Sequence, residues 1–161
     1  MSISDYLFKL RQKIGHDRVM MPGVTGIVIN AAGEILLQRS VDTGQWYLPG
    51  GAMDPGEEPA DTVVREIWEE TGVRAVPEQI TGVYAEPLVT YPNGDQVLYT
   101  CIAFRCQPIG GQARVNDEES LEVRYFAVPD LPDLTDQDRL RIRHARSPEP
   151  RTFFLMSGRQ G

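Results

Sequence analysis

The sequence predicts an α/β protein in which a mixed β-sheet lies between helices. Two observations support this class: a capped amphipathic helix near the middle of the chain, and β-type apolar segments on both sides of it. A third is a second helical pattern after the last of these segments. The 161 residues, 41% of them hydrophobic and 24% charged, suit a single domain over residues 1–161.

The chain before the central helix predicts one helix and three strands. An amphipathic pattern over residues 4–14 predicts a helix within an N-terminal extension of residues 1–18. We expect this helix to cover the core, with a partner subunit as the alternative. The expected strands are residues 24–30, 34–40 and 46–48. The first two are expected to pair as a β-hairpin through the turn at residues 31–33.

The chain after the central helix favours strands again and then one more helix. The expected strands are residues 79–85, 96–106 and 123–128. Between the first two, Tyr91 to Asp95 has the composition of a loop tip. Thr135 to Arg146 is expected to be the second helix. Residues 147–161 are rich in Pro, Arg and Gly, so we expect a partly mobile tail in which Phe153 and Phe154 dock back on the fold.

The most informative segment runs from Gly51 to Val73 and contains the central helix. Pro59 suits a first helical position, where its missing N–H is no loss, and Asp61 suits the first turn. Gly72 suits the position just past the end, so the predicted helix is 59–71.

Three carboxylates of this helix, those of Glu66, Glu69 and Glu70, fall within an arc of roughly 100°. The other side is expected to pack on the core and carries Ala60, Val63, Val64, Ile67 and Trp68. We therefore expect the acids to face outward. A solvated acidic face is the plain alternative, but the preceding Gly-Gly turn and Glu57 favour a site for a hard divalent cation.

The segment resembles the Nudix box of the Nudix hydrolases, a MutT-like family. The fixed positions of that motif are filled by Gly51, Glu57, Arg65, Glu66, Ile67, Glu69, Glu70, Gly72 and Val73. Trp46 and the Leu48–Gly51 run are also typical of the family, and the resemblance covers roughly residues 19–131. It implies the Nudix fold, an α/β/α sandwich with a mixed central sheet.

The resemblance also implies a function. Nudix hydrolases use Mg²⁺, sometimes Mn²⁺, to cleave the pyrophosphate of a nucleoside diphosphate linked to another group. By position, the metal ligands would be Glu66, Glu69 and Glu70, with the Gly50 carbonyl. Glu57 and Arg65 would hold the loop and the ligand carboxylates in place.

The general base and the substrate contacts are left open by the sequence. Glu69, Glu70 or a glutamate of the 117–119 run could act as the base, and Glu119 is preferred within that run. Candidate substrate contacts are Arg39, Trp46, Tyr91 and Asp95, together with Asn93 and Tyr84. A surface ion pair for Arg39 and core packing for Trp46 and Tyr84 are the alternatives.

ADP-ribose or a nucleotide sugar is slightly favoured as the substrate. A nucleoside triphosphate, a dinucleoside polyphosphate and a non-catalytic nucleotide-sensing role are the alternatives. The net charge of −7 argues against nucleic-acid binding, and no run of about 18 apolar residues suggests a membrane span. Cys101 and Cys106 should face opposite sides of one strand, which suits a reduced, cytoplasmic protein. A homodimer remains open.

Overall fold

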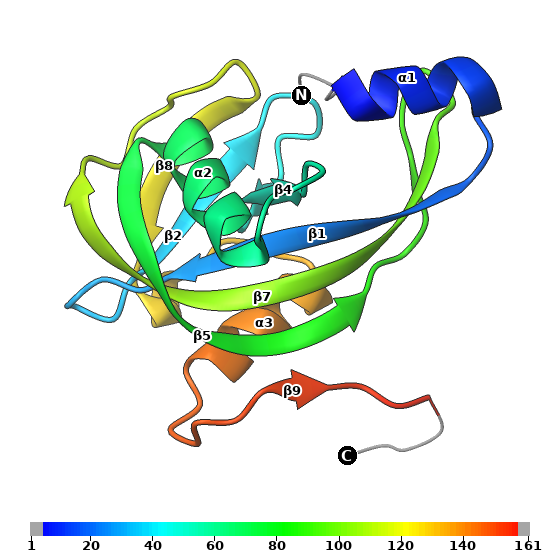
Figure 1. The fold of residues 1–161 in the computed structure, drawn as a ribbon. Helices are drawn as coiled ribbons and strands as arrows, with labels where there is room; N and C mark the ends of the chain where they lie inside the picture. Colours follow the sequence, from blue (N-terminus) through cyan, green and yellow to red (C-terminus); the bar gives the residue numbers. More distant parts are fainter. Residues whose placement is uncertain (1–4, 158–161) are drawn as a thin grey trace.

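The computed structural model describes residues 5–157 (Figure 1). Within this part of the chain, three α-helices are interspersed among the β-strands. In chain order they are α1 (Asp5–Ile14), β1 (Val19–Val28), β2 (Ile35–Ser40), β3 (Trp46–Tyr47), β4 (Gly50–Ala52), α2 (Pro59–Thr71), β5 (Val73–Ala85), β6 (Val89–Thr90), β7 (Gln96–Gly111), β8 (Ser120–Phe126), the 3₁₀ turn η1 (Val128–Asp130), α3 (Asp136–Ala145) and β9 (Phe153–Phe154). Residue 4 of the predicted first helix and residues 158–161 of the tail lie outside the described part.

Two sheets carry the fold. The larger has the order β4-β1-β7-β5-β9, with β6 paired to β7, and the smaller has the order β3-β2-β8. The larger sheet is mixed, because β1 pairs with β7 in parallel and with β4 antiparallel. The expected mixed sheet between helices is therefore confirmed.

The faces of β1 show how the helices cover the sheets. Val24 and Val28 pack in one buried cluster with Val63 and Ile67 of α2. Ile27, on the opposite face of the strand, packs in the second cluster, which contains residues of α3. The core therefore has two layers, one under α2 and one under α3, and Figure 1 shows α2 against β1.

The predicted hairpin between the first two strands is wrong. The chain does turn back, since the Asn30 N–H donates to the Glu34 carbonyl at 3.1 Å and Ile29 bridges Ile35. However, β2 pairs with β3 and β8 in the smaller sheet. β7 pairs with β1 over its whole length and β4 pairs with it at residues 23–25, so β1 and β2 share only the bridge beside the turn.

The expectation that the first helix covers the core is also wrong. None of the residues of α1 is buried. The helix is held instead by polar contacts of Arg11, which donates to the carbonyls of Gly15, Asp17 and Gln96 at 3.2, 2.6 and 3.1 Å. It therefore braces the start of β7 rather than closing the core.

The predicted C-terminal helix is confirmed, whereas the mobility of the tail stays a prediction. Thr135 caps α3 by accepting from the Asp138 N–H at 3.1 Å, and the helix ends at Ala145. The expected docking of the Phe pair is confirmed: β9 pairs in parallel with Gly82 and Val83 of β5. The Phe153 ring stacks on the ring of His144 with a centroid distance of 3.9 Å.

The two cysteines are free and buried, and they lie on opposite faces of β7 as predicted. Cys106 belongs to the cluster under α2, whereas the Cys101 thiol lies 3.0 Å from the Thr25 hydroxyl. No helix within residues 5–157 combines the length and the apolar character needed to span a bilayer.

Candidate active site

The site is built on the central and C-terminal turns of α2, which carry Glu66, Glu69 and Glu70. The helix begins at Pro59 and ends at Thr71, as predicted, and Gly72 follows with φ 68°. The Gly72 N–H donates to the Trp68 carbonyl at 3.0 Å, which closes the last turn. Only glycine adopts this left-handed conformation at little cost, so the helix stops where the Nudix-like motif places its last glycine.

Two adjacent glycines of β4 let the strand approach both β1 and the helix. A Cβ on Gly50 would lie 2.2 Å from the Val24 carbonyl oxygen. A Cβ on Gly51 would lie 2.6 Å from the carboxylate of Glu66. A larger residue at Gly50 would therefore push β4 away from β1, and one at Gly51 would push it away from the Glu66 carboxylate.

Arg65 is the centre of an ion-pair network. Its Nε and Nη2 donate to the two carboxylate oxygens of Glu57 at 2.8 and 2.9 Å, a bidentate pair. Glu57 also accepts from the Asp54 N–H at 3.0 Å and from the Thr62 hydroxyl at 2.9 Å. These donors, Arg65 foremost, lower the pKa of Glu57 to about 2. Glu57 is thus held as a carboxylate that fixes the loop before the helix.

The same guanidinium reaches two carboxylates of the helix. Arg65 Nη1 lies 2.8 Å from Glu66 and 3.2 Å from Glu69. Glu70 has a different partner, because it accepts the Gly50 N–H at 2.9 Å. The network therefore joins the loop, β4 and the three glutamates that the sequence singles out.

The expectation that these acids face outward is wrong for Glu70, which is only 9% exposed. Burial, followed by the charge of Glu66, raises the pKa of Glu70 to about 8. Burial also raises the pKa of Glu66, although the charge of Arg65 opposes this rise. Two neighbouring carboxylates are thus removed from water together. A bound cation would lower the free-energy cost of keeping both of them charged.

Arg65→Lys should reduce kcat/KM by about 10- to 100-fold, because lysine keeps the charge but loses the bidentate fork. It should also weaken the protein in acid. Glu57 has a lowered pKa, so its contribution to stability is present above pH 4.5 and is lost as the pH falls through about 2. Without the fork that pKa rises, and the acid-unfolding midpoint should move to higher pH. An unchanged midpoint in a circular-dichroism titration would contradict this assignment.

A cleft of about 980 Å³ opens over the network. Its acidic lining residues are Asp42, Asp54, Glu57, Glu66, Glu69, Glu70, Asp95, Asp117, Glu118 and Glu119. The cations among its lining residues are Arg11 and Arg65. Both guanidinium groups are engaged, Arg11 by backbone carbonyls and Arg65 by the glutamates. The cleft is therefore strongly negative.

The loop of residues 117–119 forms one wall of the cleft. The Asp117 carboxylate accepts the N–H groups of Glu119 and Ser120 at 3.1 and 3.0 Å. The Glu119 carbonyl accepts the Val41 N–H at 2.8 Å, which ties the loop to the end of β2. The charge of Asp117 contributes to the raised pKa of Glu70, so the loop lies beside the helix carboxylates. The structure thus brings Glu119 into the same cleft.

The loop tip between β6 and β7 forms another wall. Tyr91, Asn93 and Asp95 all line the cleft. The Tyr91 hydroxyl lies 2.9 Å from that of Tyr99. Asp95 bonds to His16 at 2.7 Å, which lowers the pKa of Asp95 and anchors the loop to the end of α1. Asp95 thus holds the loop in place, while Tyr91 presents a ring to the cleft.

The structure does not bring three other candidates into this cleft. The Arg39 side chain donates to the Gly44 carbonyl at 2.9 Å, and Arg39 does not line the cleft. Trp46 packs edge-on against Phe126 at 4.8 Å. Tyr84 bonds to His144 of α3 at 2.6 Å and belongs to the core layer under that helix. Trp46 and Tyr84 therefore pack inside the fold, which was the alternative to substrate contact.

Two residues of the network have weak signals in the sequence. Thr62 supports Glu57 from the first turn of α2, and its place five residues after this glutamate is a weak signal in the sequence. Asn116 donates to the carbonyls of Trp68 and Glu69 at 2.9 and 3.2 Å. Since it lies far away along the chain, nothing local predicts that it covers the end of α2.

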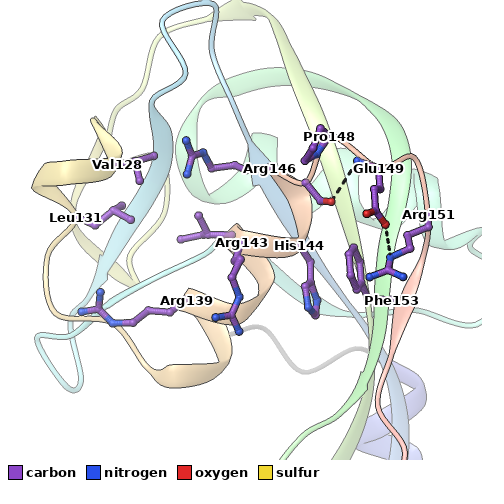
Figure 2. A pocket seen from close by; sticks show the side chains of 12 residues that line it. Val128, Leu131, Arg139, Arg143, His144, Arg146, Pro148, Glu149, Arg151 and Phe153 are labelled. Atoms are coloured by element: carbon purple, nitrogen blue, oxygen red, sulfur yellow. Dashed lines mark hydrogen bonds and ion pairs between the residues drawn. The ribbon is translucent and has the colours of Figure 1, made fainter. Parts of the chain in front are cut away.

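A second cavity, of about 780 Å³, lies around α3 and the segment leading to β9. Figure 2 shows that the guanidinium groups of Arg139, Arg143, Arg146 and Arg151 point in different directions around this helix. Arg151 pairs with Glu149 at 3.1 Å, and Arg139 with Asp133 at 3.5 Å. Because these cations do not converge on one point, we assign no ligand to this cavity.

The residues of the cleft fit a hard divalent cation by their chemistry. Carboxylate oxygens suit Mg²⁺ or Mn²⁺, and Gly50, whose carbonyl is expected as a further ligand, lines the same cleft. Within residues 5–157, however, no group of three or more His, Cys, Asp or Glu side chains is gathered to hold an ion in this conformation. Arg65 explains this, because it holds Glu66 and Glu69 as ion pairs. We expect cation binding to exchange some of these contacts.

Comparisons with known proteins identify the family to which the chain is similar. A family model described as "NUDIX domain" matches residues 19–146. A MutT-like protein of Streptomyces ambofaciens is 38% identical over 97 residues, which are 60% of this chain and 58% of that protein. An RNA pyrophosphohydrolase of Cereibacter sphaeroides is 38% identical over 112 residues, which are 68% of this chain and 64% of that protein. The chain thus spans less than two thirds of either relative.

Similarity extends to solved structures. The crystal structure of an ADP-ribose pyrophosphatase from Streptococcus suis superposes with a TM-score of 0.64 and 25% identity. The match covers 84% of this chain and 98% of that chain.

Proposed function

The chain belongs to the NUDIX family, and we propose that it is a Mg²⁺-dependent pyrophosphohydrolase of nucleoside diphosphate derivatives. The observation that carries the proposal is the acid-lined cleft, whose two arginines are both engaged within the protein. A polyphosphate would be repelled by this lining unless divalent cations lay between the two. Nudix hydrolases generally use such ions, and the cluster of Glu66, Glu69 and Glu70 is where we place them.

The residues of the chain have distinct roles in this proposal. Glu66, Glu69, Glu70 and the Gly50 carbonyl bind the cation, which neutralises phosphate charge and activates water when bound. Glu57 and Arg65 fix the loop and the helix carboxylates through the bidentate pair. We assign the general base to Glu119, because the 117–119 loop faces the cleft beside Glu70.

The substrate class is proposed from the shape and chemistry of the cleft. Its far wall carries Tyr91 and Tyr99, whose rings offer a surface on which a nucleobase can stack. We favour ADP-ribose or a nucleotide sugar, in keeping with the name of the Streptococcus suis structure. The RNA pyrophosphohydrolase relative makes a triphosphorylated RNA end a second candidate, although the net charge of −7 disfavours a long polyanion.

A panel of substrates tests the proposal. ADP-ribose, nucleotide sugars, dinucleoside polyphosphates, nucleoside triphosphates and a short 5′-triphosphorylated RNA are incubated with the protein in Mg²⁺ and in excess chelator. Mg²⁺-dependent release of a nucleoside monophosphate from the first two would support the proposal. Cleavage of the RNA or of the triphosphates alone would assign the enzyme to the alternative class. A folded, metal-binding protein that cleaves no member would favour a nucleotide-sensing role.

A further inference from the structure

A buried amide lies under the helix that carries the glutamates. Gln38 of β2 is 0% exposed, which is unusual for so polar a side chain. Its Oε1 accepts the Ser120 hydroxyl of β8 at 2.9 Å. Its Nε2 is also buried and makes no hydrogen bond of normal geometry within the described residues. A buried donor without a partner is costly, so this atom needs an explanation.

The position of Gln38 on its strand shows what the amide faces. Leu36, two residues earlier on the same face of β2, packs with Val63 and Ile67 of α2. Gln38 therefore points toward the same helix, two residues further along the strand. The next turn of that helix carries Glu70, whose carboxylate is also buried.

Other polar side chains of the smaller sheet also lie near this carboxylate. Gln38 pairs across the small sheet with Tyr47 of β3. Burial, followed by the charge of Glu70, raises the pKa of Tyr47, so the phenol also lies near that carboxylate. The Gln38 amide also lies close enough to interact with the Glu70 carboxylate.

The orientation of the amide follows from hydrogen-bond chemistry. A carboxylate can only accept, so an amide beside it must present its N–H groups. The Ser120 hydroxyl donates to Oε1 and leaves Nε2 for the carboxylate. A hydroxyl can serve either end of an amide, so the acceptor-only carboxylate is the group that favours Nε2 on its side and leaves Oε1 to Ser120.

We propose that Gln38 is a positioning residue for Glu70. It donates a hydrogen bond to this carboxylate in the cation-bound state and thereby fixes the oxygen that faces the cation. The Gly50 N–H donates from the other side at 2.9 Å, so Glu70 is held between a strand of each sheet. The inference rests on the proposed function, because it assumes that Glu70 binds a cation.

Gln38→Met tests the proposal, because methionine keeps the unbranched shape and removes the amide. Mn²⁺ binding is measured by electron paramagnetic resonance on the protein without substrate, and the Mg²⁺ dependence of hydrolysis is measured separately. We expect the Mn²⁺ dissociation constant and the half-maximal Mg²⁺ concentration to rise by about 10- to 100-fold, as is usual when a partner of a metal ligand is lost. KM for substrate at saturating Mg²⁺ should stay unchanged, which a general loss of structure would not allow.

Two controls separate positioning from stability. Thr81→Val removes a buried hydroxyl that donates to the Ala103 carbonyl, away from the cleft residues. Ser120→Ala removes the partner of Oε1 but leaves Nε2 beside Glu70. Neither should weaken Mn²⁺ binding as much as Gln38→Met. If Gln38→Met does not fold, Gln38→Asn replaces it, since the shorter amide cannot reach Glu70.

The outcomes distinguish this inference from the proposed function. Wild-type Mn²⁺ affinity in a folded Gln38 variant would overturn the inference, and so would an equal loss in Thr81→Val. Failure of the wild-type protein to bind Mn²⁺ would instead overturn the proposed function, and the inference with it.

Discussion

Glu70→Gln is expected to lower kcat/KM by about 10²- to 10³-fold, which corresponds to a loss of roughly 3–4 kcal/mol of transition-state stabilisation. The substitution removes a ligand charge but keeps the shape of the side chain. The amide oxygen of glutamine can still accept the Gly50 N–H, so the fold should persist. Steady-state kinetics at saturating Mg²⁺, beside a circular-dichroism spectrum of the variant, measure both effects.

The same variant should be more stable than the wild type when no metal is present. Burial raises the pKa of Glu70 from 4.5 to about 8, so folding favours its protonated form. The contribution of protonated Glu70 to the free energy of unfolding is therefore fully present below pH 4.5. It is lost as the pH rises through about 8. Glutamine mimics the protonated form at every pH. At pH 9 in chelator we expect a gain of about 1–3 kcal/mol in the free energy of unfolding.

A variant that is inactive but no more stable than the wild type in chelator would contradict the buried, charged state assigned to Glu70. Glu58→Gln is the matched control, because Glu58 lies just before α2 and is exposed. This control should leave both the activity and the stability unchanged.

Ile67→Ala is expected to cost about 2–5 kcal/mol of unfolding free energy, the range for a deleted core side chain. Ile67 is 0% exposed and lies directly over Gly26, where an added Cβ would be 2.6 Å from its Cδ1. The helix is thus seated tightly on β1, and the substitution leaves a cavity that lets α2 shift. Urea denaturation followed by circular dichroism gives the change in stability.

Trp68→Ala is the contrasting variant. The sequence places Trp68 on the core side of the helix, but this expectation is wrong, because the side chain is 37% exposed. Arg74 lies over its ring, with Cζ 5.3 Å from the centroid. We expect a cost of only about 1 kcal/mol, mainly the lost cation–π contact. A larger cost for Trp68→Ala than for Ile67→Ala would contradict the described seating of α2.

The parts of the fold that local chemistry determines were predictable. Pro59, Gly72 and Thr135 each mark a helix boundary through their own backbone or side-chain geometry. The pairing of β2 was not predictable, because it depends on which edges of β1 are taken by β4 and by the distant β7. Short-range patterns favour a hairpin and contain no information about those competitors.

The candidate site divides in the same way. The Glu57–Arg65 pair lies within one motif, and its spacing can be read from the chain. The surroundings of Glu70 include Gln38 and Asp117, which lie far from it along the chain. A helical projection gives only the arc on which Glu70 lies, so it could not show that the small sheet covers this part of α2.

The most direct test of the account is thermal unfolding of the wild type and Glu70→Gln, each with Mg²⁺ and with chelator, at pH 8. A site that binds the cation only in the folded protein stabilises it by about 2.7 kcal/mol at a hundred times the dissociation constant. Mg²⁺ is expected to raise the melting temperature of the wild type, whereas Glu70→Gln should gain little. No gain in the wild type, or an equal gain in both proteins, would contradict the assignment of the cation to the α2 carboxylates.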